Sequence, residues 1–205
     1  MNVENKNKVI WRQDLIDMCR SFHNCENKES PLPLNKQWFT LGGPIVGDNG
    51  IMKPLSEYPH LISNGLQPHQ FISIENDIIT HNLNSTIIGP KWLYGSILFV
   101  IASESNNRKT FNPGFLNLDL YSMALRGGLF QLSQITDILT GLNVKDIMIA
   151  ANFVLKYRHE DDYRKIPDIL IKHTNFGSIR HLWNIEGMMT YRNRNTTMGT
   201  IILYR

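Results

Sequence analysis

"QFISIEND", residues 70–77, is the stretch of sequence that decides the fold class. Its apolar first half is typical of a short strand, and the strand is expected to end at Glu75. Upstream, "KQWFTLGGP" (36–44) is an aromatic and β-branched run that stops at a Gly-Gly-Pro turn. Between these two runs, residues 55–62 carry apolar side chains at helical spacing, and Gly65 stands where a helix ends. Strand, helix and strand in this order form a βαβ unit, which implies parallel pairing.

Strands and helices continue to alternate along the rest of the chain. The run "KWLYGSILFVIASES" (91–105) is predicted to be a helix, although periodicity alone also fits a buried strand. A strand at 115–122, a helix at 123–143 and a strand at 144–155 follow. Residues 179–205 read as two strands joined by a polar turn, so the last strand should run antiparallel to its neighbour. The sequence therefore predicts an α/β fold: a Rossmann-like, doubly wound, mostly parallel sheet with a C-terminal antiparallel β-hairpin.

Composition indicates an ordinary globular chain. It has 205 residues, 42% of them hydrophobic and 19% charged. Residues 9–22 form one amphipathic helix, and the two prolines within 27–36 separate it from the next element, so 1–34 is predicted to be an N-terminal helical appendage to an α/β domain at 35–205. The longest apolar run, 95–102, is far too short to span a membrane, which favours a cytoplasmic protein.

The net charge, the cysteines and the histidines indicate which partners and metal sites to expect. The formal net charge of +3 permits a phosphate-bearing partner without requiring one. Cys19 and Cys25 are too few for a disulfide framework or a four-cysteine zinc site, and they are predicted to be reduced thiols. The histidines are scattered and show no metal-ligand spacing, so no metal is expected.

The order of elements from about 37 to 205 resembles the class I S-adenosylmethionine-dependent methyltransferases. In that family the first strand ends in a glycine-rich loop beside the cofactor, the second ends in an acidic residue that binds the ribose, and the fourth ends near the reacting methyl group. Here "TLGGP" (40–44), "SIEND" (73–77) and "NLDLYS" (117–122) occupy these three strand ends. The ending "YRNRNTTMGTIIL" (191–203) resembles the final hairpin of small methyltransferase-like proteins from phages and mobile elements.

The resemblance implies S-adenosylmethionine as cofactor, bound by Gly42, Gly43, Glu75 and Asn76. Glycine lets the backbone approach a ligand closely, although a tight turn would need glycine equally. A carboxylate can accept hydrogen bonds from both hydroxyls of a ribose, whereas the alternative for Glu75 is a solvated acid at a strand end. Asp77 is better explained as the N-cap of a following helix.

Asp119 is the candidate catalytic residue. Alternation in the strand at 115–122 places leucines on one side and Asn117, Asp119 and Tyr121 on the other. A central parallel strand is usually apolar on both faces, so this polar side indicates a site or an internal hydrogen-bond network, unless the strand lies at a wet edge. Asp119 could orient or deprotonate a methyl acceptor. Tyr121 could stack on a base, although an aromatic beside a strand also suits the core.

The C-terminal hairpin carries the candidate contacts to a macromolecular substrate. Tyr191, Arg192 and Arg194 combine stacking and phosphate-binding groups, as a surface for RNA or DNA would. The leading hypothesis is a methyltransferase that acts on a nucleic acid. Because "LGGPIVGDNG" (41–50) lacks the usual Gly-x-Gly-x-Gly pattern, the alternative is a non-catalytic module that binds nucleic acid or protein. A nicotinamide-dependent enzyme is disfavoured, since its loop depends on those glycines more strictly.

Overall fold

The computed structural model describes residues 6–25, 29–41, 45–46, 52–53, 57–105, 111–120, 125–155, 165–193 and 196–205. The chain divides into two compact units, Met1–Phe115 and Leu116–Arg205. The first unit holds, in chain order, α1 (Lys6–Phe22), β1 (Gln37–Leu41), β2 (Ile45–Val46), β3 (Met52–Lys53), α2 (Glu57–Ser63), the 3-10 turn η1 (Pro68–Gln70), β4 (Phe71–Glu75), α3 (Ile78–Asn84), β5 (Lys91–Tyr94) and α4 (Ile97–Ser105).

The strand β6 (Pro113–Asp119) begins in the first unit and ends in the second. The second unit continues with α5 (Leu125–Gly141), β7 (Met148–Leu155), α6 (Ile166–Ile171), α7 (Thr174–Ile179), the 3-10 turn η3 (Arg180–Leu182), β8 (Asn184–Asn193) and β9 (Thr196–Tyr204). Seven of the strands are hydrogen-bonded in the order β5-β4-β1-β6-β7-β9-β8, and β2 pairs with β3 separately.

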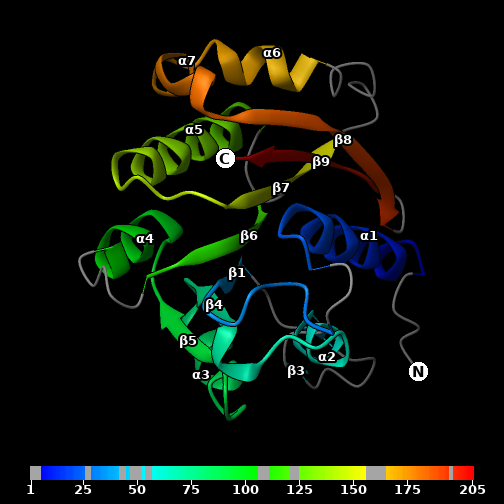
Figure 1. The fold of residues 1–205 in the computed structure, drawn as a ribbon. Helices are drawn as coiled ribbons and strands as arrows, with labels where there is room; N and C mark the ends of the chain where they lie inside the picture. Colours follow the sequence, from blue (N-terminus) through cyan, green and yellow to red (C-terminus); the bar gives the residue numbers. More distant parts are fainter. Residues whose placement is uncertain are drawn as a thin grey trace. The chain divides into compact units, whose positions relative to one another are not determined.

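The first unit is built on the predicted βαβ unit. β1 pairs with β4 and β4 pairs with β5, both in parallel, with α2 and α3 on the connections between them. Figure 1 shows these three strands side by side, with α3 next to β4 and β5. The apolar face of α1 is buried through Trp11, Leu15, Ile16 and Cys19, and two of these residues, Leu15 and Ile16, line a small cavity with Trp38 of β1. The division of the chain into an appendage at 1–34 and a domain at 35–205 stays a prediction.

Gly65 ends the α2 segment as the sequence predicts. Its φ of +89° lies in the region that favours glycine, and a Cβ built on it would stand 2.2 Å from the carbonyl oxygen of Glu29. The chain therefore turns here in a conformation, and against a neighbour, that any larger residue would disturb.

The prediction of one helix over 91–105 is wrong in its first part. Lys91–Tyr94 form β5, which is an edge strand of the parallel sheet, and only Ile97–Ser105 are helical. The division falls at Gly95, whose φ is +141°. The apolar run continues from the half-buried Trp92 and Leu93 of β5 to the buried Ile97 and Val100 of α4, so hydrophobicity does not mark the boundary.

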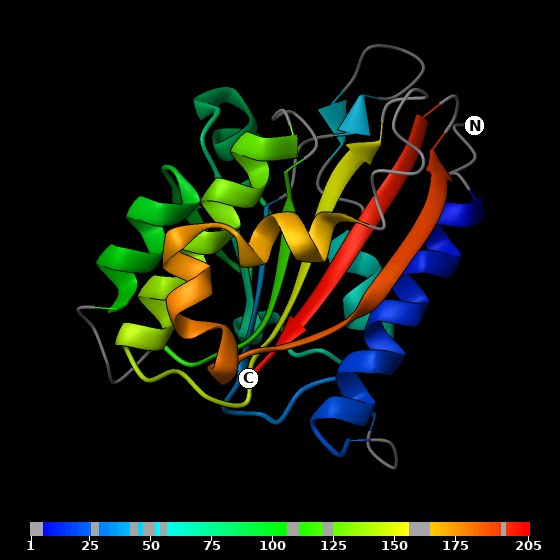
Figure 2. The same cartoon turned by 90° about the horizontal axis from the view of Figure 1, so that it is seen from above.

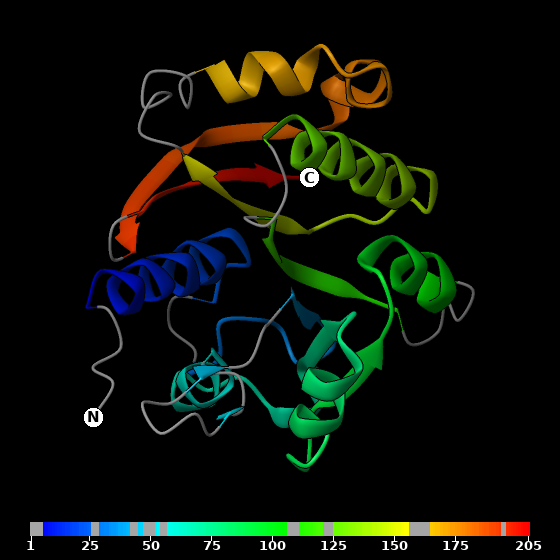
Figure 3. The same cartoon turned by 180° about the vertical axis from the view of Figure 1, so that it is seen from behind.

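The second unit contains the predicted hairpin. β9 runs antiparallel to both β7 and β8: it pairs with Met148–Leu155 in one register and with Asn184–Asn193 across a register shift between Glu186 and Met188. Figure 2 shows the length of this hairpin, and Figure 3 shows α5, α6 and α7 together beside β8. The Trp183 indole donates to Thr140 Oγ1 on α5 at 2.9 Å, which holds the start of β8 against that helix. Together the two units confirm the mostly parallel α/β sheet with a C-terminal antiparallel strand pair. Among the described helices, none is long and apolar enough to cross a bilayer.

Candidate cofactor and acceptor site

In the first unit, three parallel strands end at the same edge. Leu41 at the end of β1 lies opposite Ile74, and Glu75 at the end of β4 lies opposite Tyr94 at the end of β5. In an open parallel sheet, ligands bind beyond the carboxyl ends of the strands. The polar residues that follow β4 and the exposed residues that follow β5 therefore lie where a ligand would be expected.

Glu75 is a half-buried carboxylate, and its two oxygens differ in their hydrogen bonds to the described residues. Its Oε1 accepts the backbone N–H groups of Asn76 at 2.9 Å and Asp77 at 3.0 Å. Burial raises the pKa of the Glu75 carboxyl above its ordinary value, and these two hydrogen bonds offset part of the rise. Within the described part of the chain, Oε2 has no hydrogen-bond partner. The side chain is thus oriented by its own backbone, and its second oxygen can accept from a ligand.

Asp77 is the N-cap of α3, as the sequence predicts. Its Oδ2 accepts the backbone N–H of Thr80 at 2.8 Å, and the hydrogen bonds from Thr80 hold the pKa of the Asp77 carboxyl below its ordinary value. The side chain of Asn76, between the two acids, is exposed. Asp77 thus stabilises the helix, whereas Glu75 and Asn76 can face a ligand.

Tyr94 and His81 border the same strand end, and sequence reasoning missed both. Tyr94 is 53% exposed, and its ring lies 5.7 Å from that of His81. Ile78 and Ile79, which follow Asp77 directly, are exposed apolar residues as well. The signal is present in "WLYG" (92–95), where a glycine follows an aromatic strand. It is easily lost, because the continuous apolar run also predicts a helix.

In the second unit, β6 has a polar and a leucine-lined face, and both are buried up to Leu118. The Asn117 carboxamide oxygen accepts from Asn152 Nδ2 at 2.9 Å, and Asn152 Oδ1 accepts from Thr200 Oγ1 at 2.7 Å. β6 stands between β1 and β7 in the strand order, so the alternative of a wet edge strand is wrong. The polar side is, at Asn117, an internal hydrogen-bond network.

Asp119 is the last residue of β6 and is half-buried. It lies two residues beyond Asn117 and therefore on the same face of the strand. The next residue, Leu120, donates its backbone N–H to the carbonyl oxygen of Asn152 at 3.0 Å, which fixes the strand end against β7. Asp119 thus forms the carboxyl end of an ordered strand.

The remaining predicted site residues fall in three groups. Gly42, Gly43, Tyr121 and Arg194 lie outside the described residues. Arg192 belongs to β8, where it pairs with Thr197. Tyr191, its neighbour, is half-buried and pairs with Met198.

The side chains that could bind a metal ion or react as thiols are not clustered in the described part of the chain. No group of three or more His, Cys, Asp or Glu side chains there could hold a metal ion. Cys19 and Cys25 are both free and buried. Burial raises the pKa of the Cys19 thiol well above its ordinary value.

No protein-family model matches the chain, and no curated protein matches it. Solved structures do match. A candidate S-adenosylmethionine-dependent methyltransferase from Streptococcus mutans aligns with a TM-score of 0.57 and 9% identity, over 97% of this chain and 49% of that one. The METTL16 MTase domain aligns with a TM-score of 0.53 and 12% identity, over 97% and 66%. The chain has the class I methyltransferase fold.

A third structure is informative because its ligand is named. Magnesium protoporphyrin IX methyltransferase (ChlM) from Synechocystis PCC 6803, with bound S-adenosylhomocysteine, aligns with a TM-score of 0.53 and 12% identity, over 100% of this chain and 89% of that one. By contrast, the chain spans about half the length of the Streptococcus protein. Identities this low establish the fold alone.

The residues at the ends of β4 and β5 suit the cofactor that methyltransferases of this fold use. A ribose needs an acceptor for two hydroxyls, and Glu75 offers an oriented carboxylate with an available oxygen. An adenine needs an apolar or aromatic surface, and Tyr94, Ile78 and Ile79 expose one. The chemistry of these side chains therefore fits S-adenosylmethionine.

Proposed function

We propose that the protein is an S-adenosylmethionine-dependent methyltransferase that acts on a nucleic acid. The observation that carries the proposal is Glu75, whose Oε1 is held by two backbone N–H groups while Oε2 has no partner among the described residues. A carboxylate fixed in this way loses little freedom when it binds a diol.

Within this proposal, the candidate site residues of the first unit hold the cofactor. Glu75 accepts hydrogen bonds from the ribose hydroxyls, and the exposed Asn76 carboxamide adds a polar contact. The ring of Tyr94 contacts the adenine. Gly42 and Gly43 allow the backbone after β1 to approach the cofactor, because they carry no Cβ.

The bound cofactor would supply an activated methyl group. Methyl transfer is an in-line displacement, so the protein's contribution is mainly to position the acceptor. Asp119 orients the acceptor and takes its proton where the acceptor must lose one. Its place at the end of β6, beside an ordered polar network, supports a defined orientation for this carboxylate. Tyr121 stacks on the acceptor base.

The shape of the hairpin supports a large acceptor. Leu120, the residue after β6, is hydrogen-bonded to Asn152 on β7. Leu155 lies three residues further along β7 and pairs with Thr197 of the hairpin. At about 3.3 Å per residue, the hairpin therefore extends about 10 Å beyond the end of β6. Arg192 pairs with Thr197 on the outermost strand, three strands from β6, or about 14 Å across the sheet. This length supports a polymer, and not a small acceptor, as the partner that Tyr191, Arg192 and Arg194 would contact.

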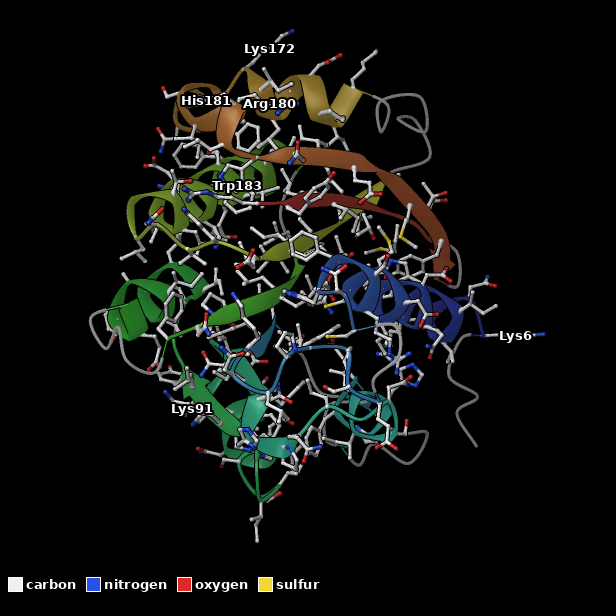
Figure 4. The ribbon with its side chains drawn as sticks, in the orientation of Figure 1. Lys6, Lys91, Lys172, Arg180, His181 and Trp183 are labelled. Carbon is white, nitrogen blue, oxygen red and sulfur yellow. The ribbon has the colours of Figure 1, made fainter. Side chains whose placement is uncertain are left out.

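The alternative is a non-catalytic module with the same fold, and the departure of "LGGPIVGDNG" (41–50) from the usual glycine pattern favours it. Basic side chains also occur away from the hairpin tip. Figure 4 shows Lys172, Arg180 and His181 at the corner between α6, α7 and η3. The phage or mobile-element type and the cytoplasmic location stay predictions.

Calorimetric titration with S-adenosylmethionine and S-adenosylhomocysteine tests the proposal. We expect binding by the wild-type chain, and about 10- to 100-fold weaker binding by Glu75→Gln, because a neutral amide replaces two charge-assisted contacts. The matched control is Glu29→Gln, which removes the same charge from an exposed position in the same unit. No heat with either ligand at high micromolar protein would contradict the enzyme function. Undiminished binding by Glu75→Gln would contradict the ribose assignment.

A further inference from the structure

The sheet has an open edge at β5, within the first unit. β5 is the last strand in the sheet order, so it pairs along one edge only, with β4. All four residues of β5 are partly or largely exposed, whereas β1 and β4 each bury at least three consecutive residues. Figure 1 shows β5 outside β4, with α3 beside both. An edge of this kind presents backbone N–H and C=O groups with which another strand can pair.

The hydrogen bonds to β4 show which backbone groups of β5 point outward. Gly95 donates its N–H to the carbonyl oxygen of Glu75 at 3.0 Å. Because successive residues of a strand direct their backbone groups to opposite edges, Leu93 also faces β4, and Trp92 and Tyr94 face outward. Among the described residues, none is hydrogen-bonded to these outward N–H and C=O groups. They are therefore available to a second strand.

Large apolar side chains are exposed around this edge. Ile88, which precedes β5, is 95% exposed, and Tyr94 at its end is 53% exposed. Phe99 of α4 is 66% exposed and lies beside the strand end, since its ring would be 3.3 Å from a Cβ built on Gly95. Of the ten exposed large apolar residues in the described part of the chain, five lie within 78–99. A concentration of this kind indicates a surface that contacts another molecule.

The charge near the edge favours a second copy of the chain as the partner. Lys91 is the only Asp, Glu, Lys or Arg residue in the sequence from 78 to 103, and its ammonium forms an ion pair with Glu104. A lysine on an edge strand normally disfavours pairing, because its charge repels an identical strand. Here Glu104 compensates that charge, so two copies can approach without net repulsion. A nucleic acid would find no unpaired lysine or arginine in this segment.

We propose that β5 pairs antiparallel with β5 of a second copy, about a two-fold axis at Leu93. In this register Trp92 and the partner's Tyr94 exchange two N–H···O hydrogen bonds, and so do Tyr94 and the partner's Trp92. All outward groups of both strands are then used. An axis at Trp92 would instead place Tyr94 opposite the partner's Pro90, which has no N–H to donate. The inference goes beyond the proposed function and does not depend on it.

Side chains add to the pairing and set its strength. Residues directly opposite each other lie on one face of a sheet, so each Trp92 contacts a Tyr94 across the axis, and such aromatic pairs stabilise sheets. Tyr94 and Phe99 together expose about 180–300 Å². A standard interface buries about 800 Å² per partner. The dimer should therefore be reversible, with a dissociation constant weaker than about 1 µM.

Sedimentation velocity of the full-length apoprotein over a concentration series tests the assembly. We expect the weight-average mass to rise from that of one chain toward that of two above about 1 µM. Tyr94→Lys should remain monomeric, because it removes the aromatic pair and adds like charges near the axis. The matched control is Phe130→Lys, which changes a 51% exposed aromatic residue of α5 and should dimerise like the wild type. A wild type that is monomeric throughout, or equal effects of the two variants, would overturn the proposal.

Amide hydrogen exchange of the wild type, followed residue by residue by NMR, locates the contact without any variant. Between the lowest and highest protein concentrations, we expect the Trp92 and Tyr94 amides to exchange about tenfold more slowly, because they are hydrogen-bonded only in the dimer. The Leu93 and Gly95 amides, which face β4, should change little and serve as the internal reference. Dimerisation without this alternation would place the interface elsewhere and overturn the proposal. So would full protection of Trp92 and Tyr94 in the monomer.

Discussion

Gly95 donates its backbone N–H to the carbonyl oxygen of Glu75 across 3.0 Å. This hydrogen bond joins the last residue of β4 to the turn after β5. Since the Glu75 side chain also accepts two backbone N–H groups from the residues after it, the strand end is fixed on both sides. A change of the side chain should therefore alter ligand binding and leave the backbone in place.

Glu75→Gln should separate stability from binding. Because burial raises the pKa of Glu75 in the folded protein, the fold disfavours its charged form, and stability rises as the pH falls through the folded pKa. A neutral glutamine removes that disadvantage at pH 7. We expect the unfolding temperature of the apoprotein at pH 7 to stay equal or to rise, while the affinity for S-adenosylmethionine falls. A fall of many degrees in a thermal scan would show that the carboxylate is structural.

Asp77→Asn should show the opposite dependence on pH. Hydrogen bonds from Thr80 lower the pKa of Asp77 from its ordinary value of 3.8 in the folded protein. Its charge therefore stabilises the fold above the unfolded-state pKa, and this stabilisation is lost as the pH falls through the folded pKa. Asparagine remains an N-cap but carries no charge. Chemical denaturation should give a stability difference between the two proteins near pH 7 that shrinks below about pH 4. A difference that stays constant with pH would contradict this assignment.

Thr200→Val tests the buried network of the second unit. The substitution leaves Asn152 Oδ1 without the hydroxyl that now donates to it at 2.7 Å, in a site where Asn152 is 2% exposed. Denaturant titration should show a loss of about 1–3 kcal/mol in the free energy of unfolding. Thr190→Val, at an exposed position of β8, is the matched control and should change it by less than about 0.5 kcal/mol. Equal effects of the two variants would mean that the network contributes nothing specific.

Gly65→Ala should destabilise the first unit. A non-glycine residue at this φ costs about 1–3 kcal/mol, and the contact with the Glu29 carbonyl adds to that cost. Gly141→Ala at the end of α5 is the control, because nothing lies within 4 Å of a Cβ there. The control should be neutral, or stabilising by up to about 1 kcal/mol. Both values come from denaturant titration, and a harmless Gly65→Ala would be inconsistent with the described turn.

Replacing Arg192 and Arg194 by alanine should weaken retention on single-stranded nucleic acid. If each arginine contacts one phosphate, the slope of log affinity against log salt should become shallower by about 1.4. The control double variant, Lys6→Ala with Lys172→Ala, removes the same charge from exposed positions elsewhere. Fluorescence anisotropy over a salt series measures both. Equal loss in the two double variants would indicate general charge attraction and not contact through the hairpin.

The sequence suffices for features that depend on neighbouring residues. The stop at Gly65, the N-cap at Asp77 and the hairpin at the C-terminus each follow from local backbone chemistry, and all three are present. The parallel pairing of β1, β4 and β5 then follows from the alternation of strand and helix, as the sequence predicts. Local signals fail where the apolar pattern is continuous, which is why the sequence predicts a helix over β5 and does not reveal Tyr94.

Features that depend on distant residues are not accessible from one sequence. An acidic residue at the start of a helix usually lies on the surface, and nothing near Glu57 indicates that Trp38, 19 residues earlier, donates to it. Likewise, the partner of Asn117 lies 35 residues further along the chain. The sequence predicts a polar face on β6, but only the folded sheet shows that Asn117 forms a buried hydrogen bond inside it.

The ladder of Asn117, Asn152 and Thr200 also bears on how the strands find their correct alignment. An apolar sheet could shift by one residue at modest cost, but such a shift would place Asn152 opposite Gly199 or Ile201 in a dry interior. The Asn152 carboxamide oxygen would then lose the Thr200 hydroxyl that donates to it, so a shifted pairing leaves a buried acceptor without its donor. Removing the ladder should therefore broaden the set of pairings that the refolding chain samples.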